Sequence, residues 1–138
     1  MAFLRSILIY FSTLVFMILL DSIWIGFLMT DLYRTQISQL LSIAPDSIQF
    51  KILPALLTWA LIVFGSMFFV SPLTMNASFM ATFLYGAIFG LVLYGVYDLT
   101  NYATLTGWWI KTSIVDTLWG MFLNGAVAVF LKFIQRVF

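Results

Sequence analysis

The chain has 138 residues, of which 64% are hydrophobic and only 8% are charged, and its formal net charge is +1. A soluble domain of this length cannot bury so much apolar surface, and so small a charge gives no basic field that would attract nucleic acid. The chain contains neither cysteine nor histidine, which excludes disulfides, thiol catalysis, histidine-ligated haem or zinc, and a Ser-His-Asp triad.

We therefore expect an all-α integral membrane protein with a single membrane domain, residues 1–138, built as a compact four-helix transmembrane bundle. The first spanning helix is predicted at residues 3–30, a run too long for the apolar part of a signal peptide and without a small-residue cleavage site. In the connection at residues 31–46, apolar residues recur at helical spacing, which favours a short helix in the membrane interface. An equally good interpretation is that the first span continues into water.

The other three spans are separated by turn-forming residues and are predicted at residues 47–70, 79–101 and 108–133. Asp46-Ser47-Ile48-Gln49 has the form of a capping box before the second span. Ser71-Pro72 is expected to end that span, and Gly107 is expected in the turn before the last one.

Four spans place both termini on one side of the membrane. Basic residues are equally numerous on the two sides, so they do not decide the orientation, and we place both termini in the cytoplasm. Membrane lipid is the expected partner. A second copy of the chain is also expected as a partner, through Gly86 and Gly90, whose spacing lets two helix backbones approach closely.

Three of the five acidic residues, Asp21, Asp98 and Asp116, fall inside apolar spans. A carboxylate near the bilayer centre costs roughly 2.5–3.5 kcal/mol, so such residues usually face the bundle interior and have a purpose. Counting from the helix ends at ~1.5 Å per residue puts Asp21 and Asp116 about 12–14 Å below the same interface, with Asp98 shallower. All three are therefore predicted in one leaflet.

Tryptophan follows Asp21 and Asp116 at the same spacing, and an indole N–H within the bilayer needs an acceptor such as a carboxylate. Tyr94 and Asn101 share a helix face with Asp98. The candidate ligand-binding residues are Asp21, Trp24, Trp59, Tyr94, Asp98, Asn101, Asp116 and Trp119. We assign them no metal ion, no catalytic role and no particular cofactor.

Three functions agree with this pattern. The leading hypothesis is binding or transport of a proton, a cation or a small polar ligand, because unpaired buried carboxylates must be protonated, share a proton or bind a cation. The first alternative is a membrane-embedded enzyme acting on a lipid or isoprenoid substrate, although no phosphotransfer motif is present. The second is a structural or accessory membrane subunit, in which these polar residues only hold the helices together.

The string Tyr97-Asp98-Leu99-Thr100-Asn101, followed by Ala103-Thr104-Leu105 and Gly107-Trp108, resembles an uncharacterised bacterial family of membrane proteins, domain of unknown function 2177. The segments around Asp21/Trp24/Gly26, Tyr33-Arg34 and Asp116/Trp119/Gly120 are similar to that family's other motifs. Trp109 departs from the pattern, in which proline is expected after Gly-Trp. The resemblance implies a compact four-helix protein of the bacterial inner membrane, and it implies no particular activity.

Overall fold

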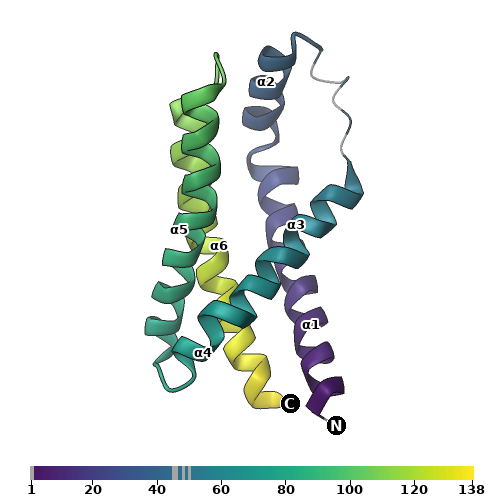
Figure 1. Cartoon of the computed structure of the whole chain (residues 1–138). Helices are drawn as coiled ribbons and strands as arrows, with labels where there is room; N and C mark the ends of the chain where they lie inside the picture. The colour runs from purple at the N-terminus through teal and green to yellow at the C-terminus, as the bar shows by residue number, and fades with distance from the viewer. Residues whose placement is uncertain (1, 45–46, 48, 50) are drawn as a thin grey trace.

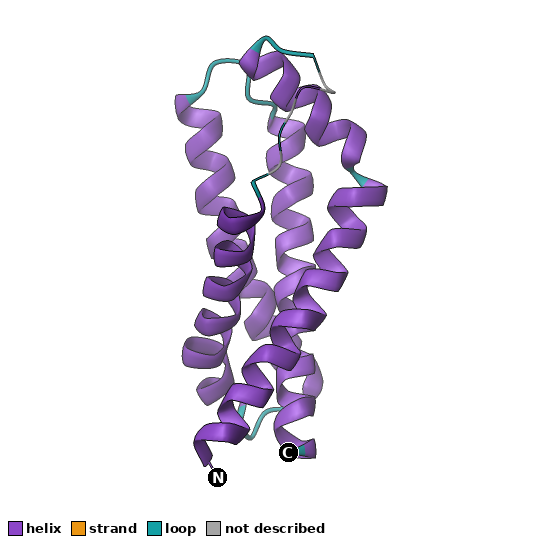
Figure 2. Cartoon of the chain, turned by 90° about the vertical axis from the view of Figure 1, so that its right-hand side faces the viewer, coloured by secondary structure: helices purple, strands orange, loops and turns teal. Residues whose placement is uncertain are grey.

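The computed structural model describes residues 2–44, 47, 49 and 51–138, and every regular element in these residues is helical. Within them, the helical stretches long and apolar enough to cross a membrane are Phe3–Leu28, Ile52–Thr74, Phe79–Thr104 and Ile110–Val137. These stretches pack into a bundle that has both chain termini at the same end (Figures 1 and 2). The predicted fold class, an all-α membrane protein with a four-helix transmembrane bundle, is confirmed.

In chain order the elements are α1 (Ala2–Ile23), the π-helical turn η1 (Trp24–Leu28), α2 (Thr30–Leu41), α3 (Ile52–Gly65), the π-helical turn η3 (Ser66–Val70), α4 (Ser71–Thr74), α5 (Phe79–Thr104) and α6 (Ile110–Val137). A bend at Met29, where the backbone leaves helical values (φ −122°, ψ 12°), separates the first span from α2. The short helix predicted after the first span is therefore present as α2, and its depth relative to the membrane surface stays a prediction.

The second span differs from the predicted range at both ends. Its helix begins at Ile52 rather than at residue 47, and Asp46 and Ile48 of the predicted capping box lie outside the described residues. Ser71-Pro72 does not end the span, which continues to Thr74.

The preceding π-helical turn explains why the helix tolerates this proline. In a regular α-helix the proline ring collides with the carbonyl four residues earlier, and the missing N–H leaves that carbonyl without a partner. In η3 the N–H of Ser71 instead bonds to the carbonyl of Ser66, five residues back, which widens the helix immediately before Pro72.

Short connections define where the last two helices begin. The side chain of Ser78 caps α5 by accepting a hydrogen bond of 3.2 Å from the N–H of Ala81. The turn between α5 and α6 contains Gly107 at φ +91°, a left-handed conformation that glycine adopts at little cost. The two helices extend to Thr104 and Val137, each a few residues past the predicted end.

Helices α5 and α6 lie side by side along most of their length (Figure 1), and small residues allow this close approach. A methyl group added to Gly86 would collide with the carbonyl oxygen of Asn124, and one added to Gly90 with the carbonyl oxygen of Gly120. The Gly86/Gly90 face is thus occupied by α6 of the same chain. Homo-oligomer formation through Gly86 and Gly90 stays a prediction.

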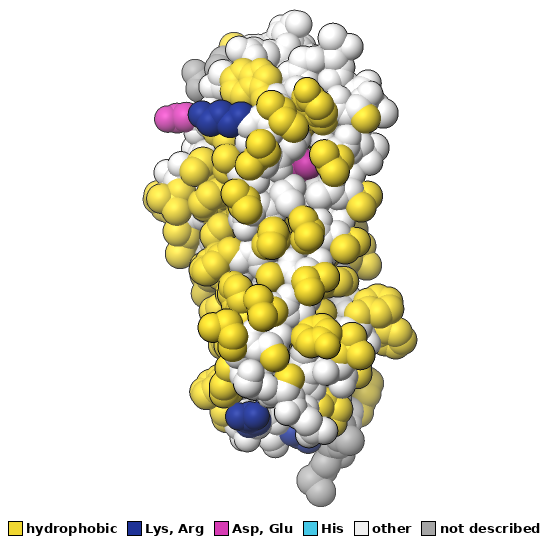
Figure 3. Space-filling view, turned by 90° about the vertical axis from the view of Figure 1, so that its left-hand side faces the viewer, with side chains coloured by type: hydrophobic (Ala, Val, Ile, Leu, Met, Phe, Trp, Pro, Cys, Tyr) yellow, Lys and Arg dark blue, Asp and Glu magenta, His cyan; other side chains and the backbone are white. Residues whose placement is uncertain are grey.

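The core contains the fully buried side chains of Met17, Val63, Leu123 and Val127, contributed by α1, α3 and α6. Many other large apolar side chains lie outside, and hydrophobic groups cover the middle of the face shown in Figure 3, with lysine and arginine nearer its ends. A four-helix bundle whose exterior is this apolar suits lipid as its solvent.

Candidate functional site

The predicted acidic residues come together in the half of the bundle nearer α2. Asp21 on α1 and Asp98 on α5 are 4% and 0% exposed, and Asp116 on α6 is half-buried. The carboxyl groups of Asp98 and Asp116 are near enough to interact electrostatically. Trp119, one turn further along α6, donates to Asp21. None of the three carboxyl groups faces lipid alone, as the cost of a buried charge requires.

Asp21 is the acceptor for two indole groups from different helices. The Nε1–H groups of Trp59 on α3 and Trp119 on α6 donate to its two carboxylate oxygens, each over 2.7 Å. Both oxygens therefore have a donor, and both indoles have the acceptor that an apolar environment demands. This arrangement connects α1, α3 and α6 at the level of the core.

Trp24 belongs to a second connected group. Its ring stacks on Trp119 with a centroid distance of 4.3 Å and an interplanar angle of 2°. Its Nε1–H donates over 3.0 Å to the hydroxyl of Tyr33, which in turn donates over 2.5 Å to Asp116. Because Trp24 begins the π-helical turn η1, that turn sets the direction in which the indole leaves α1.

The carboxyl group of Asp98 has a different environment. It is fully buried, and neither of its oxygens accepts a hydrogen bond from an N–H or O–H donor in the described part of the chain. The nearby hydroxyl of Ser113 donates instead to the backbone carbonyl of Asp98, over 3.3 Å. The carboxyl of Asp116 is the charged group that acts on Asp98. Two neighbouring carboxylates repel each other, so a shared proton or a bound cation would stabilise the pair.

Two amide side chains near this pair also have unused donors. The Nδ2 of Asn101, one turn after Asp98 on α5, is buried and has no partner among the described residues, and the same holds for the Nε2 of Gln36 on α2. Gln36 is held in place because its Oε1 accepts a hydrogen bond from the hydroxyl of Thr112, one turn before Asp116 on α6. This end of the bundle thus offers both carboxylate acceptors and amide donors.

A cleft between α3, α5 and α6 leads to Asp116. Its volume is about 420 Å³, and it is lined by Thr58, Ile62, Leu93, Tyr94, Tyr97 and Asp116. The ring of Tyr94 lies against Gly120 of α6, where any larger side chain would displace it. The cleft makes Asp116 the member of the acidic pair that a small molecule can reach.

The structure divides the predicted site residues into two sets. In the first set, Asp21 accepts the indole hydrogen bonds of Trp59 and Trp119. In the second set, Asp98 and Asn101 have buried polar atoms without a partner among the described residues, and Asp116 lines the cleft. Tyr94 lines the cleft, and Trp24 supports the hydroxyl that binds Asp116. Among the described residues, no three Asp side chains converge as ligands of one metal ion.

Sequence reasoning did not place Tyr33, Gln36, Thr112 or Ser113 in the site. One signal was available, since Tyr33 and Gln36 are spaced i, i+3 and so share a face of α2. Burial and the adjacent Asp116 carboxyl raise the pKa of the Tyr33 hydroxyl well above its ordinary value. Tyr33 therefore stays protonated and remains a donor to Asp116.

Comparison with known proteins identifies the family of the chain and no more. Neither the curated proteins nor the solved structures contain a match to the chain. The family model described as "Predicted membrane protein (DUF2177)" matches residues 6–132, a range that includes every candidate site residue and all four spans nearly in full. The chain therefore belongs to this family of predicted membrane proteins.

Proposed function

We propose that the protein binds a proton or a small cation at the paired carboxyl groups of Asp98 and Asp116, within the membrane. The observation that carries the proposal is the Asp98 carboxyl, which is fully buried and has no donor from the described residues. An isolated buried carboxylate is too costly to persist, so the pair needs a positive partner.

The surroundings of the pair favour a cation small enough to enter between the helices. The cleft of about 420 Å³ gives access to Asp116 from the side of the bundle. The unpartnered amide N–H groups of Gln36 and Asn101 would suit a ligand that also carries an acceptor, such as a hydroxyl oxygen. A small ammonium ion with a hydroxyl group combines both properties.

Asp21 has no place in this binding step. Its two oxygens already accept indole hydrogen bonds, and using it as a ligand would break both. The proposed site is therefore narrower than the three-acid site that the sequence suggested, and it consists of Asp98, Asp116 and the adjacent amides.

Thermal unfolding of the purified protein in detergent tests the proposal. Two adjacent carboxylates repel each other, so lowering the pH or adding Na⁺, ammonium or ethanolammonium should raise the melting temperature of the wild type. A cation at ~100 times its Kd would add about 2.7 kcal/mol of stability. Asp98→Asn should lose this response and keep the unliganded fold, because asparagine can donate to Asp116 but cannot neutralise a cation.

Asp31→Asn is the matched control, because Asp31 is exposed on α2 and lies outside the spans. It should respond like the wild type. A response that is equal in the wild type and Asp98→Asn, or a wild type indifferent to pH and to all three cations, would exclude the proposed site.

We also propose that the protein lies in the bacterial inner membrane with both termini in the cytoplasm. The even number of spans supports placing the two termini on one side. Because the chain has no cysteine, single thiols introduced by Ser42→Cys and Phe138→Cys can report the sides directly. A membrane-impermeant maleimide added outside should label only the thiol at position 42, and labelling only at position 138 would reverse the orientation.

A further inference from the structure

A second polar cavity lies at the opposite end of the bundle, where both termini are. Its volume is about 410 Å³, and α1, η3, α4 and α6 contribute to its walls. Three basic side chains line it, those of Arg5, Lys132 and Arg136, and none of its lining residues is acidic.

Uncharged groups hold these three cations in place. Arg5 donates to the carbonyl of Gln135 over 2.7 Å, and the guanidinium of Arg136 lies 4.8 Å from the ring centroid of Phe79. Lys132 is 5% exposed, and its ammonium group donates to backbone carbonyls that follow α4, including that of Ala77 over 2.6 Å. Carbonyls and aromatic rings orient a cation without cancelling its charge, so the cavity keeps a positive potential.

The acidic residues of the spans are too far away to act as counterions. Asp116 precedes Lys132 by sixteen residues on α6, which is about 24 Å at 1.5 Å per residue. This is far longer than the ~4 Å over which the charged groups of a salt bridge meet. Among the described residues, therefore, no acidic side chain lies close enough to pair with these cations.

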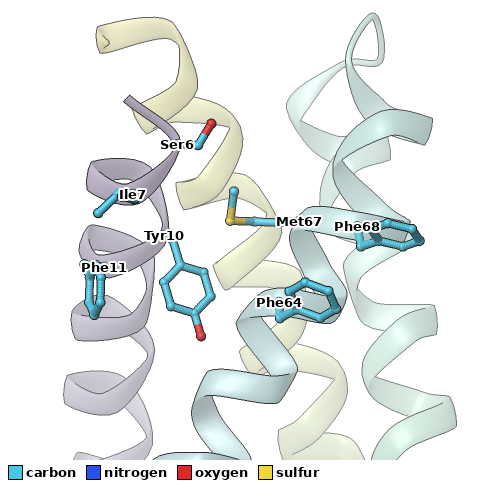
Figure 4. A pocket seen from close by; sticks show the side chains of 7 residues that line it. All are labelled: Ser6, Ile7, Tyr10, Phe11, Phe64, Met67 and Phe68. Atoms are coloured by element: carbon cyan, nitrogen blue, oxygen red, sulfur yellow. The ribbon is translucent and has the colours of Figure 1, made fainter. Parts of the chain in front are cut away.

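An apolar groove of about 380 Å³ continues from this cavity along the bundle, and Ser6 and Met67 line both. Its other lining residues are Ile7, Tyr10, Phe11, Phe64 and Phe68, on α1, α3 and η3. Figure 4 shows Ser6 at one end of this groove and the rings of Phe11 and Phe64 further along it. A cationic cavity that opens into an apolar groove matches a ligand with an anionic head and a hydrocarbon tail.

From these two adjoining spaces we infer a binding site for an anionic phospholipid. The phosphate lies among Arg5, Lys132 and Arg136, and one acyl chain lies in the groove between Phe11 and Phe64. Arginine binds phosphate oxygens in a bidentate manner, and basic pockets between transmembrane helices accept phosphate headgroups. Arg5 and Lys132 lie near the ends of their spans, at the depth where a lipid phosphate is found.

Lipid binding to the purified full-length protein, measured by native mass spectrometry in detergent, tests this inference. The probes are phosphatidylglycerol and phosphatidylcholine with identical acyl chains, and inorganic phosphate. Wild type should bind phosphatidylglycerol more tightly than phosphatidylcholine. Arg5→Gln and Arg136→Gln should each weaken phosphatidylglycerol binding about fivefold, since one cation near an anionic headgroup contributes ~1 kcal/mol.

Two matched variants separate this site from a general effect of charge. Lys51→Gln and Lys111→Gln remove the same charge from exposed positions at the opposite end and should leave phosphatidylglycerol binding unchanged. Ile7→Trp should fill the groove and weaken lipid binding while Arg5 and Arg136 remain. Lys132 is left intact in all variants because its ammonium group caps the end of α4.

Three results would overturn the inference. Equal affinity for the two phospholipids would show that the headgroup charge does not matter. If Lys51→Gln and Lys111→Gln weakened phosphatidylglycerol binding as much as Arg5→Gln and Arg136→Gln, the lipid would not bind at this cavity. Binding of inorganic phosphate as tight as that of phosphatidylglycerol, with no effect of Ile7→Trp, would indicate a phosphate site and no lipid site.

Discussion

Asp21→Asn tests whether Asp21 stabilises the helix bundle and takes no part in the cation binding proposed for Asp98 and Asp116. Asparagine has nearly the size of aspartate but replaces one carboxylate oxygen with an amide that can only donate. One of the two 2.7 Å bonds from Trp59 and Trp119 then becomes a donor facing a donor. An interhelical hydrogen bond in a membrane protein contributes ~0.6 kcal/mol on average and up to ~1.7, and a buried donor without a partner costs about 1–3 kcal/mol. We expect a loss of about 1–3 kcal/mol in the free energy of unfolding.

The assay is unfolding in mixed detergent micelles, followed by tryptophan fluorescence, on Asp21→Asn, Trp119→Phe and the double variant. If the Asp21–Trp119 bond is the main interaction lost, the two single effects will not add in the double variant. Exposed Asp31→Asn serves as the control and should change stability by less than ~0.5 kcal/mol. An Asp21→Asn effect as small as the control, or full additivity with Trp119→Phe, would refute the structural role of Asp21. The response to added cations should be unchanged in Asp21→Asn.

Two further predictions concern packing and pH. Gly90→Ala should lower the free energy of unfolding by about 3 kcal/mol, because its new methyl group meets the backbone carbonyl of Gly120. Gly26→Ala is the control: its methyl group meets nothing within 4 Å, so unfolding in mixed detergent micelles should show no measurable loss. The pKa of Tyr33 is raised from its ordinary value of 10.0 by burial and by Asp116, so the unfolded chain releases this proton at lower pH than the folded one. The stability that Tyr33 contributes should be complete below pH 10 and should be lost as the pH rises above 10. Tyr33→Phe should reduce this loss in unfolding curves measured at alkaline pH. An equal loss of stability in the wild type and in Tyr33→Phe would contradict the buried environment of Tyr33.

The convergence of the intramembrane acids could be predicted from the sequence because it depends only on connectivity. A helix rises by a constant ~1.5 Å per residue, so counting from the ends of adjoining spans gives the depth of Asp21, Asp98 and Asp116 without knowledge of how the helices pack. The same reasoning explains why tryptophans at equal depth, such as Trp59, are found as hydrogen-bond donors.

Counting residues could not predict which of the three acids accepts the indole hydrogen bonds and which two form the pair. Which carboxyl an indole reaches depends on the rotation of each helix about its axis, and packing against neighbours sets that rotation. The contribution of α2 was hidden for a related reason. The bend at Met29 directs Tyr33 and Gln36 towards α6, and no periodicity in the sequence encodes the direction of a bend.

The charges of this bundle are arranged as two unpaired groups at opposite ends, and this arrangement has a physical consequence. The acids Asp98 and Asp116 and the cations Arg5 and Lys132 would stabilise each other if they met. Sixteen residues of α6, however, keep Asp116 and Lys132 about 24 Å apart. In a structure that served only to hold four helices together, either set could be replaced by apolar residues with little loss, because buried ion pairs and polar groups rarely add net stability over good packing. This arrangement supports the two proposals, a cation at one end and a lipid phosphate at the other. Binding at one end should therefore leave the affinity at the other unchanged unless the helices between them move, and an additive effect of ethanolammonium and phosphatidylglycerol on the melting free energy would establish two independent sites.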